Sequence, residues 1–284
     1  MQNNGFSSNK TLTVRGQVID LSLPRVMGIL NITPDSFYAD SRKVHEADVV
    51  QQARQMVEAG ATFLDVGAYS SRPGADDISV DEEWTRLGPA IRAIRQHLPH
   101  CLMSVDTFRA SIAQRAVEAG ADMINDISGG EADSHMFETV ARLRVPYVAM
   151  HMRGTPQTMT QLTDYTEVVR EVIDYFHPKV ETLRGLGVAD IIIDPGFGFA
   201  KTPAHGFELL RELRALEILQ QPILVGVSRK SMIWKTLGLT AREALNGTSV
   251  LHTIALLHGA SILRVHDVRE AIECVQLVQK LHGK

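Results

Sequence analysis

The sequence lacks the features that mark secreted, zinc-binding or membrane proteins. It has only two cysteines, Cys101 and Cys274, with no Cys-x-x-Cys pair, so a disulfide framework is excluded and a reducing intracellular compartment fits. No apolar run approaches the roughly 18 residues of a membrane span, and the polar residues 1–10 do not form a secretory signal. We therefore expect a cytoplasmic protein with no membrane partner.

An excess of positive charge is also missing. Lysine and arginine total 29 against 33 aspartate and glutamate residues, which gives a formal net charge of -4. This balance offers no basic surface for nucleic acid, although it leaves room for a local cation cluster that binds a small anion. Hydrophobic residues make up 44% of the chain, which excludes disorder as its general state.

Several catalytic motifs are absent as well. The chain contains no G-x-G-x-x-G, no Walker A sequence, no H-E-x-x-H and no G-x-S-x-G. A dinucleotide fold, a P-loop, a zinc peptidase and a nucleophile elbow therefore have no support.

What the chain does contain is a repeated pattern of a helix ending at glycine followed by a short apolar run. It occurs at residues 57–66, 117–126, 186–194 and 258–265. Glycine after a helix adopts the left-handed conformation that ends it, and apolar runs without alternation are typical of strands buried on both faces. The pattern indicates repeated helix–strand units.

Extending this pattern along the chain predicts eight strands and eight helices. The strands are Val26–Asn31, Thr62–Val66, Leu102–Asp106, Met123–Asp126, Tyr147–His151, Ile191–Asp194, Ile223–Val227 and Ile262–Val265. The helices are Ala47–Ala59, Val80–Leu98, Arg109–Ala119, Ser134–Leu143, Tyr165–Leu186, Gly206–Ile218, Arg242–Leu257 and Val268–Leu281. A spacing of roughly 30 to 35 residues per unit favours an α/β fold, a single (β/α)8 TIM barrel, over the alternative of a doubly wound sheet. We expect an N-terminal extension at 1–24, with a hairpin in Thr11–Leu23 over the barrel bottom, and a barrel domain at 25–284.

Polar residues follow almost every predicted strand. They are Asn31, Asp65, Asp106, Asn125, Asp126, His151, Asp194, Ser228, Arg229, Lys230, Arg264 and His266. Some could simply start turns or cap helices, but active sites of this barrel lie at the carboxyl ends of its strands. The cations suit a small polyanion, and the carboxylates suit the guanidine-like edge of a pterin or purine. Asn31 could hold Mg2+ carried by a diphosphate.

Eight segments in order along the chain resemble the dihydropteroate synthases, pterin-binding TIM-barrel enzymes of folate biosynthesis. They are Gly28–Phe37, Ser70–Ala75, Ser104–Thr107, Ile124–Gly130, Met150–Gly154, Asp194–Phe199, Gly226–Ser231 and Arg264–Val268. Any one of them is a modest match, but the ordered set spans nearly the whole barrel and is highly specific.

The resemblance implies a transferase that joins 6-hydroxymethyl-7,8-dihydropterin diphosphate to p-aminobenzoate, with Mg2+ and without a side-chain nucleophile. By this likeness Asp106, Asn125, Asp194 and Lys230 hold the pterin, in a pocket lined by Met150, Phe199 and Gly226. Asn31 binds Mg2+, whereas Arg72, Arg264 and His266 hold the diphosphate. Ser71, Arg72, Phe199, Lys230 and Ser231 border the site of p-aminobenzoate and of competing sulfonamides. Asp106, Asp194, Lys230 and Arg72 are the expected catalytic residues.

Two loops depart from the commoner pattern of the family. Residues 68–71 read Ala-Tyr-Ser-Ser in place of Gly-Glu-Ser-Thr, and residues 38–43 lack the usual glycines. These changes bear on sulfonamide affinity rather than on the pterin residues. A pterin-binding methyl-transfer module remains an alternative, as does a non-catalytic paralogue that binds pterin or a protein. The family also implies a homodimer, for which 251–257 and 272–281 offer apolar faces that could equally belong to the core.

Overall fold

Eight parallel strands form the centre of the molecule. The structure is a computed structural model that describes residues 10–32, 42–70 and 77–283. The central strands are β3 (Arg25–Asn31), β4 (Phe63–Gly67), β5 (Leu102–Asp106), β6 (Met123–Asp126), β7 (Tyr147–Met150), β8 (Ile191–Asp194), β9 (Leu224–Val225) and β10 (Ile262–Val265). Seven of them span at least four residues, and each predicted strand is present within a residue or two, except that β9 is reduced to two residues.

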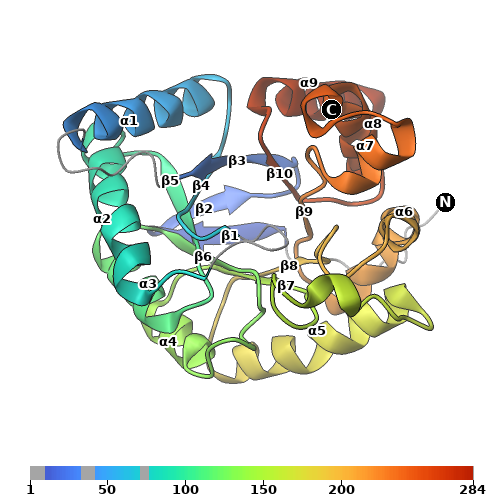
Figure 1. Cartoon of the computed structure of the whole chain (residues 1–284), viewed down its shortest axis with the longest axis horizontal. Coiled ribbons are helices and arrows are strands. Elements are labelled where there is room, and N and C mark those ends of the chain that lie inside the picture. Colours follow the sequence, from blue (N-terminus) through green and yellow to red (C-terminus); the bar gives the residue numbers. More distant parts are fainter. Residues whose placement is uncertain (1–9, 33–41, 71–76, 284) are drawn as a thin grey trace.

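The strands nearly close into a barrel. Their order is β8-β7-β6-β5-β4-β3-β10-β9, and a parallel bridge between Ile193 and Ile223 joins the first to the last. Figure 1 shows the helices arranged around the strands. This is the predicted (β/α)8 arrangement, and the doubly wound alternative is wrong.

Nine helices are described. They are α1 (Arg42–Glu58), α2 (Val80–His97), α3 (Ala110–Glu118), α4 (Met136–Leu143), α5 (Val168–Gly185), α6 (Pro203–Arg211), α7 (Ser231–Leu237), α8 (Leu245–Leu257) and α9 (Val268–Leu281). Short 3-10 turns lie at Met159–Gln161, Leu213–Leu219 and Ala241–Glu243. The sequence did not predict α7, and the predicted helix at 206–218 divides into α6 and a 3-10 turn. None of these described helices is long and apolar enough to cross a membrane.

Glycines end the helices that the repeated pattern identified. Gly60, Gly120, Gly187 and Gly259 have positive φ angles of 104°, 115°, 85° and 96°. A side chain in this left-handed region is strained, so the glycines allow each helix to turn directly into the next strand.

An antiparallel hairpin packs against the amino-terminal end of the barrel. Its strands are β1 (Thr11–Val14) and β2 (Gln17–Asp20). Leu12, Val14 and Leu21 are buried in one cluster with the first inward-facing residues of the barrel, among them Met27 and Phe63. The predicted hairpin over the barrel bottom is therefore present, and it leaves the opposite end for a site.

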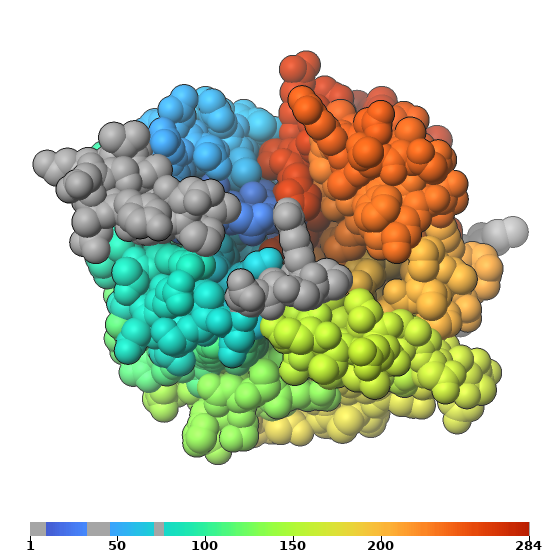
Figure 2. Space-filling view, viewed as in Figure 1, coloured from blue at the N-terminus to red at the C-terminus, as the bar shows by residue number. Residues whose placement is uncertain are grey.

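The first and the last strand of the barrel, in chain order, pair with each other. Residues 262–265 of β10 pair in parallel with residues 25–28 of β3. In the space-filling view the blue and red segments accordingly lie next to each other (Figure 2). The strand-end residues 31 and 264, far apart in sequence, are thereby brought to the same rim.

Candidate active site

Successive side chains on a strand point alternately into and out of the barrel. The polar residues predicted at the strand ends therefore fall into an inner and an outer set. On β6, Met123 joins the apolar layer at the barrel bottom and Asn125, two residues later, reaches Asp65 on β4. On β10, Ile262 joins the same layer and Arg264 follows it. Because successive strand residues point to opposite faces, the polar residues with this parity gather inside the barrel above the apolar layer.

Arg264 is the hub of the inner set. Its Nε donates to Asp65 Oδ2 at 2.6 Å, and its Nη2 donates to Asp106 Oδ2 at 2.8 Å. The same Asp65 oxygen accepts a hydrogen bond of 3.0 Å from the Asn125 amide, whereas Asp65 Oδ1 is buried with no protein partner. One guanidinium thus joins strands β4, β5 and β10, and an unused carboxylate oxygen remains inside the barrel.

Lys230 and Asp194 both approach Gly226, whose position without a side chain we call the floor of the site. A Cβ placed on Gly226 would lie 3.9 Å from both Asp194 Oδ2 and Lys230 Nζ. A distance of this size is an ordinary van der Waals contact, so a side chain at this position would not clash. The glycine instead leaves space next to two charged groups. Lys230 Nζ also donates to the carbonyl oxygen of Phe197. A flat polar ring could lie on this floor between an anion and a cation.

An apolar cluster forms one wall beside these charges. It contains Ile127, Met150, Met152, Met159 and Ala200, with Phe108 and Phe199 packed against it. The Phe199 ring lies with its centroid 4.5 Å from Lys230 Nζ, within the range of a cation–π interaction. Met150 and Phe199 were both predicted as pocket-lining residues, and this cluster brings them together.

Burial shifts the ionisation of the inner carboxylates and of Lys230. Desolvation raises the pKa of Asp106 to about 7, a shift that Arg264 opposes and Asp65 reinforces. Desolvation also raises the pKa of Asp194 against the opposing charge of Lys230. The pKa of Lys230 falls to about 8 because the ammonium is desolvated, although Asp194 partly restores it. Groups that titrate near neutrality are typical of functional sites.

Other predicted residues lie on the rim. His266 is exposed after β10, and both its backbone N–H and its Nδ1 contact Ser228 Oγ, at 3.2 and 3.1 Å. Ser231 begins α7 directly after Lys230, and Asn31 is exposed at the end of β3. Ser71 and Arg72 lie outside the described residues, as do positions 33–41 of the first loop.

Asp126 belongs to the outer set and is structural. Its carboxylate accepts hydrogen bonds from Ser128 N and Oγ at 2.7 Å, from Gly130 N at 2.9 Å and from Tyr147 Oη at 2.7 Å. Asp126 therefore forms a turn, which is the alternative interpretation of a strand-end aspartate. Its neighbour Asn125 points to the opposite side of the strand and joins the inner set.

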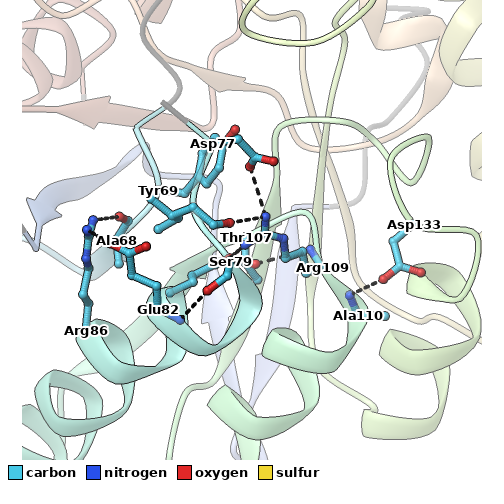
Figure 3. Close-up of polar contacts among 12 residues, drawn as sticks. Ala68, Tyr69, Asp77, Ser79, Glu82, Arg86, Thr107, Arg109, Ala110 and Asp133 are labelled. Carbon is cyan, nitrogen blue, oxygen red and sulfur yellow. Dashed lines mark hydrogen bonds and ion pairs between the residues drawn. The ribbon is translucent and has the colours of Figure 1, made fainter. Parts of the chain in front are cut away.

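Arg109 holds the residues directly before α2, where it reaches Asp77 (Figure 3). Glu83 is fully buried and accepts from Thr107 Oγ1 at 2.7 Å and from Arg109 Nη1 at 2.6 Å. Arg109 Nη2 reaches the Ile78 carbonyl at 2.6 Å and Asp77 at 3.2 Å.

Tyr69, where the family more often has glutamate, packs edge-on against Phe108 at 4.9 Å. The Arg109 guanidinium carbon lies 5.6 Å from the Tyr69 ring centroid. An aromatic ring can interact with this arginine through its π face where a carboxylate would form a salt bridge.

Sequence reasoning missed two residues that organise the site, Glu83 and Lys201. It counted Asp65 among the carboxylates suited to the substrate but did not predict its bond to Arg264. Glu83 looks like one of several acidic residues in the first turn of α2, and only burial distinguishes it. Lys201 is 8% exposed although it is a lysine in a loop, which no sequence pattern indicates.

The described residues contain no group of three histidine, cysteine or acidic side chains that could form a metal cage. Among the described residues, Asn31 offers an exposed carboxamide at the end of β3. This donor set suits Mg2+ that keeps most of its ligands from substrate oxygens and water, and it does not suit a structural metal.

Known proteins share this sequence and fold. Residues 27–266 match the family described as pterin binding enzyme. The dihydropteroate synthase of Escherichia coli is 40% identical over 270 residues, which cover 94% of this chain and 95% of the relative. The structure of Xanthomonas albilineans dihydropteroate synthase with 4-aminobenzoic acid has a TM-score of 0.88 at 35% identity, with 98% of this chain and 100% of that chain covered.

A sulfonamide complex gives a second structural match. The Yersinia pestis dihydropteroate synthase in that complex has a TM-score of 0.88 and 37% identity over 96% of this chain and all of its own. Both the fold and the near-complete length thus agree with the resemblance of the ordered motifs. The chain belongs to the pterin-binding enzyme family and, within it, to the dihydropteroate synthases, transferases of folate biosynthesis.

Proposed function

We propose that this chain condenses 6-hydroxymethyl-7,8-dihydropterin diphosphate with p-aminobenzoate in the cytoplasm, releasing diphosphate and 7,8-dihydropteroate. The observation that carries the proposal is the inner set of strand-end residues. Asp65, Asn125, Asp106 and Arg264 form one bonded network, and Asp194 and Lys230 both approach Gly226.

The pterin lies on the floor at Gly226. Asp194 accepts paired N–H bonds from the guanidine-like edge of the ring, while Lys230 donates from the other side. Asp106 and Asn125 bind the remaining polar edge, with Asp106 held in place by Arg264. Met150 and Phe199 cover the ring faces, a use for which polarisable and aromatic side chains are well suited.

The diphosphate lies toward the rim, where Arg72, Arg264 and His266 hold it. Asn31 would hold Mg2+ there, together with oxygens of the substrate. When bound there, Mg2+ neutralises negative charge on the leaving diphosphate. Arg264 contributes mainly as a buried positive charge, because two of its nitrogens already bind Asp65 and Asp106.

The p-aminobenzoate site is bordered by Ser71, Arg72, Phe199, Lys230 and Ser231, and sulfonamides compete for it. The structures of relatives with 4-aminobenzoic acid and with a sulfonamide support this assignment by similarity. The phenyl ring of the acceptor packs on Phe199, and Ser231 at the start of α7 faces its carboxylate.

The reaction is a dissociative substitution. The carbon–oxygen bond to diphosphate breaks first, and the electron-rich pterin delocalises the positive charge that remains on its methylene group. Asp106 and Asp194 stabilise that cation electrostatically, and Lys230 and Arg72 hold the reactants in register. The amine of p-aminobenzoate then forms the new carbon–nitrogen bond and loses a proton, so no side-chain nucleophile is needed.

Turnover tests the proposal directly. Purified protein with both substrates and Mg2+ should release one diphosphate for each dihydropteroate formed, and only when p-aminobenzoate is present. Folded protein that releases none would contradict it. A methyl-transfer module would bind pterin but not Mg2+–diphosphate, so calorimetric titration with diphosphate separates the two.

We also propose a homodimer through the last two helices. Leu277 and Leu281 on α9 are each 72% exposed and Val250 on α8 is 51% exposed, whereas Leu251 and Leu256 face the core. Exposed apolar side chains on neighbouring helices favour a contact between copies. Light scattering should give twice the chain mass, and Leu277→Glu should give the mass of one chain.

A further inference from the structure

Lys201 places an ammonium group inside the loop that follows β8. The residue is 8% exposed. Its Nζ lies 2.7 Å from His151 Nδ1, 3.1 Å from the Gly196 carbonyl oxygen and 3.1 Å from the Phe199 carbonyl oxygen. These contacts give each of the three ammonium protons an acceptor.

The loop, residues 195–200, is wound around this group. Gly196, Gly198 and Ala200 have φ angles of 70°, 77° and 47°. A Cβ on Gly196 would lie 2.0 Å from the His151 carbonyl oxygen, so the loop approaches the end of β7 too closely for any other residue. The alanine in the left-handed region carries a conformational cost that the surrounding contacts must offset.

The outer side of the same loop faces the active site. Phe199 presents its ring to Lys230 at 4.5 Å, and Phe197 presents its carbonyl oxygen to the same ammonium group. Phe199 thus contributes its backbone to Lys201 and its side chain to Lys230. The loop connects two lysines, and only one of them lies in the substrate pocket.

We propose that Lys201 is a positioning residue, whose ammonium fixes the loop at 195–200 so that Phe199 and the Phe197 carbonyl meet Lys230 in the geometry that binds p-aminobenzoate. The inference rests on the proposed function. The same loop reaches a group assigned to the pterin, because Gly196 N donates to Asp194 Oδ1 at 2.8 Å. Phe199 and Lys230 also border both substrates, so loss of Lys201 should weaken the binding of p-aminobenzoate and of the pterin.

His151 completes the arrangement as a neutral partner. Burial lowers the pKa of His151 to about 2, with a smaller contribution from the nearby charge of Lys201. The ring is therefore neutral, and its Nδ1 can accept a hydrogen bond from Lys201. The ring packs edge-on against Tyr175, with centroids 4.6 Å apart. A neutral acceptor explains how a lysine and a histidine can share a buried site without repulsion.

The decisive experiment replaces Lys201 with methionine, whose side chain has a similar length but no hydrogen-bond donors. Lys179→Met is the matched control, because Lys179 contacts Tyr175 and Glu131 but no residue of the loop. In Lys201→Met the KM for p-aminobenzoate should rise by about tenfold or more, as expected for the loss of charge-assisted hydrogen bonds. Calorimetric affinity for an uncharged pterin should also fall in Lys201→Met, and it should change by less than about threefold in Lys179→Met.

A conservative variant separates positioning from general stability. Lys201→Gln retains amide N–H donors and should recover part of the KM, and it replaces the methionine variant if that variant does not fold. Hydrogen exchange of residues 195–200 should accelerate in Lys201→Met and not in Lys179→Met. Unchanged exchange there, or an unchanged KM for p-aminobenzoate in a folded Lys201→Met protein, would overturn the inference. If the wild-type protein makes no dihydropteroate, the proposed function fails while the exchange measurement still tests the loop.

Discussion

At the scale of single residues, burial decides what each charged group can do. Asp126 and Asn125 are neighbours in sequence, yet one ties a turn together and the other joins the inner network. Asp106 and Lys230 are desolvated enough that both titrate near neutral pH. Asp106 is ionised and Lys230 is protonated at the same time only over a narrow pH range.

Binding of pterin should be strongest between about pH 7 and about pH 8. Affinity rises as Asp106 loses its proton through its pKa of about 7, and it falls as Lys230 loses its proton above its pKa of about 8. Calorimetry with an uncharged pterin across roughly pH 5.5–9.5 avoids titration of the diphosphate itself. A flat profile over this range would show that neither group contacts the ring.

Asp194→Asn should lower kcat/KM by at least about 100-fold, because the variant loses two charge-assisted hydrogen bonds to the ring. Asp174→Asn is a suitable control, since Asp174 carries the same carboxyl group on the surface of α5, 69% exposed. Steady-state kinetics of the two variants measure the difference. Equal activities would remove Asp194 from the site.

At the scale of elements, the strands were the most predictable part of the fold. β5, β6, β8 and β10 begin and end where the apolar runs predicted, because a strand buried on both faces leaves an uninterrupted run. α7 was not predicted, since seven residues from Ser231 to Leu237 are too few to establish a helical period. β9 is short because only Leu224 and Val225 pair with β10, and the bridge to β8 lies one residue earlier, at Ile223.

The elements on either side of residues 71–76 depend on the buried pair of Glu83 and Arg109. Arg109→Met leaves Glu83 buried without a cation, which should cost about 3 to 5 kcal/mol of unfolding free energy. Burial already raises the pKa of Glu83, so the folded state holds that proton more tightly than the unfolded state. The loss should therefore be larger at about pH 8 than at about pH 5.

Urea denaturation at the two pH values measures this difference. Arg170→Met on the α5 surface, where the arginine is 74% exposed, should change stability by less than about 0.5 kcal/mol. A loss in Arg109→Met that is independent of pH would contradict the role of the Glu83 charge.

At the scale of the whole molecule, stability and chemistry occupy opposite ends of the barrel. The hairpin covers the amino-terminal end with Leu12, Val14 and Leu21, and the charged network lies toward the carboxyl end. The sequence predicted this separation and most of the inner residues, because they follow the apolar runs at the carboxyl ends of the strands, where active sites of this barrel lie. It could not predict that Arg264 pairs with Asp65, 199 positions away, or that Lys201 is buried, since both depend on barrel closure and loop shape.

Leu12→Ala should lower the unfolding free energy by about 2 to 5 kcal/mol and leave kcat/KM unchanged. Leu12 is 1% exposed at the end of the barrel remote from the site. Val18→Ala, on the exposed face of the same hairpin at 69%, should have little effect. A changed kcat/KM in a folded Leu12→Ala protein would show that the two ends are coupled.

A crystal structure with a pterin diphosphate analogue and a sulfonamide would locate both ligands in the barrel. The pterin ring should lie on the floor at Gly226, with its guanidine-like edge on Asp194 and Lys230 on the opposite side. The sulfonamide ring should lie against Phe199. A pterin bound elsewhere, or one that leaves Asp194 and Lys230 without a contact to it, would contradict the assignment of the site.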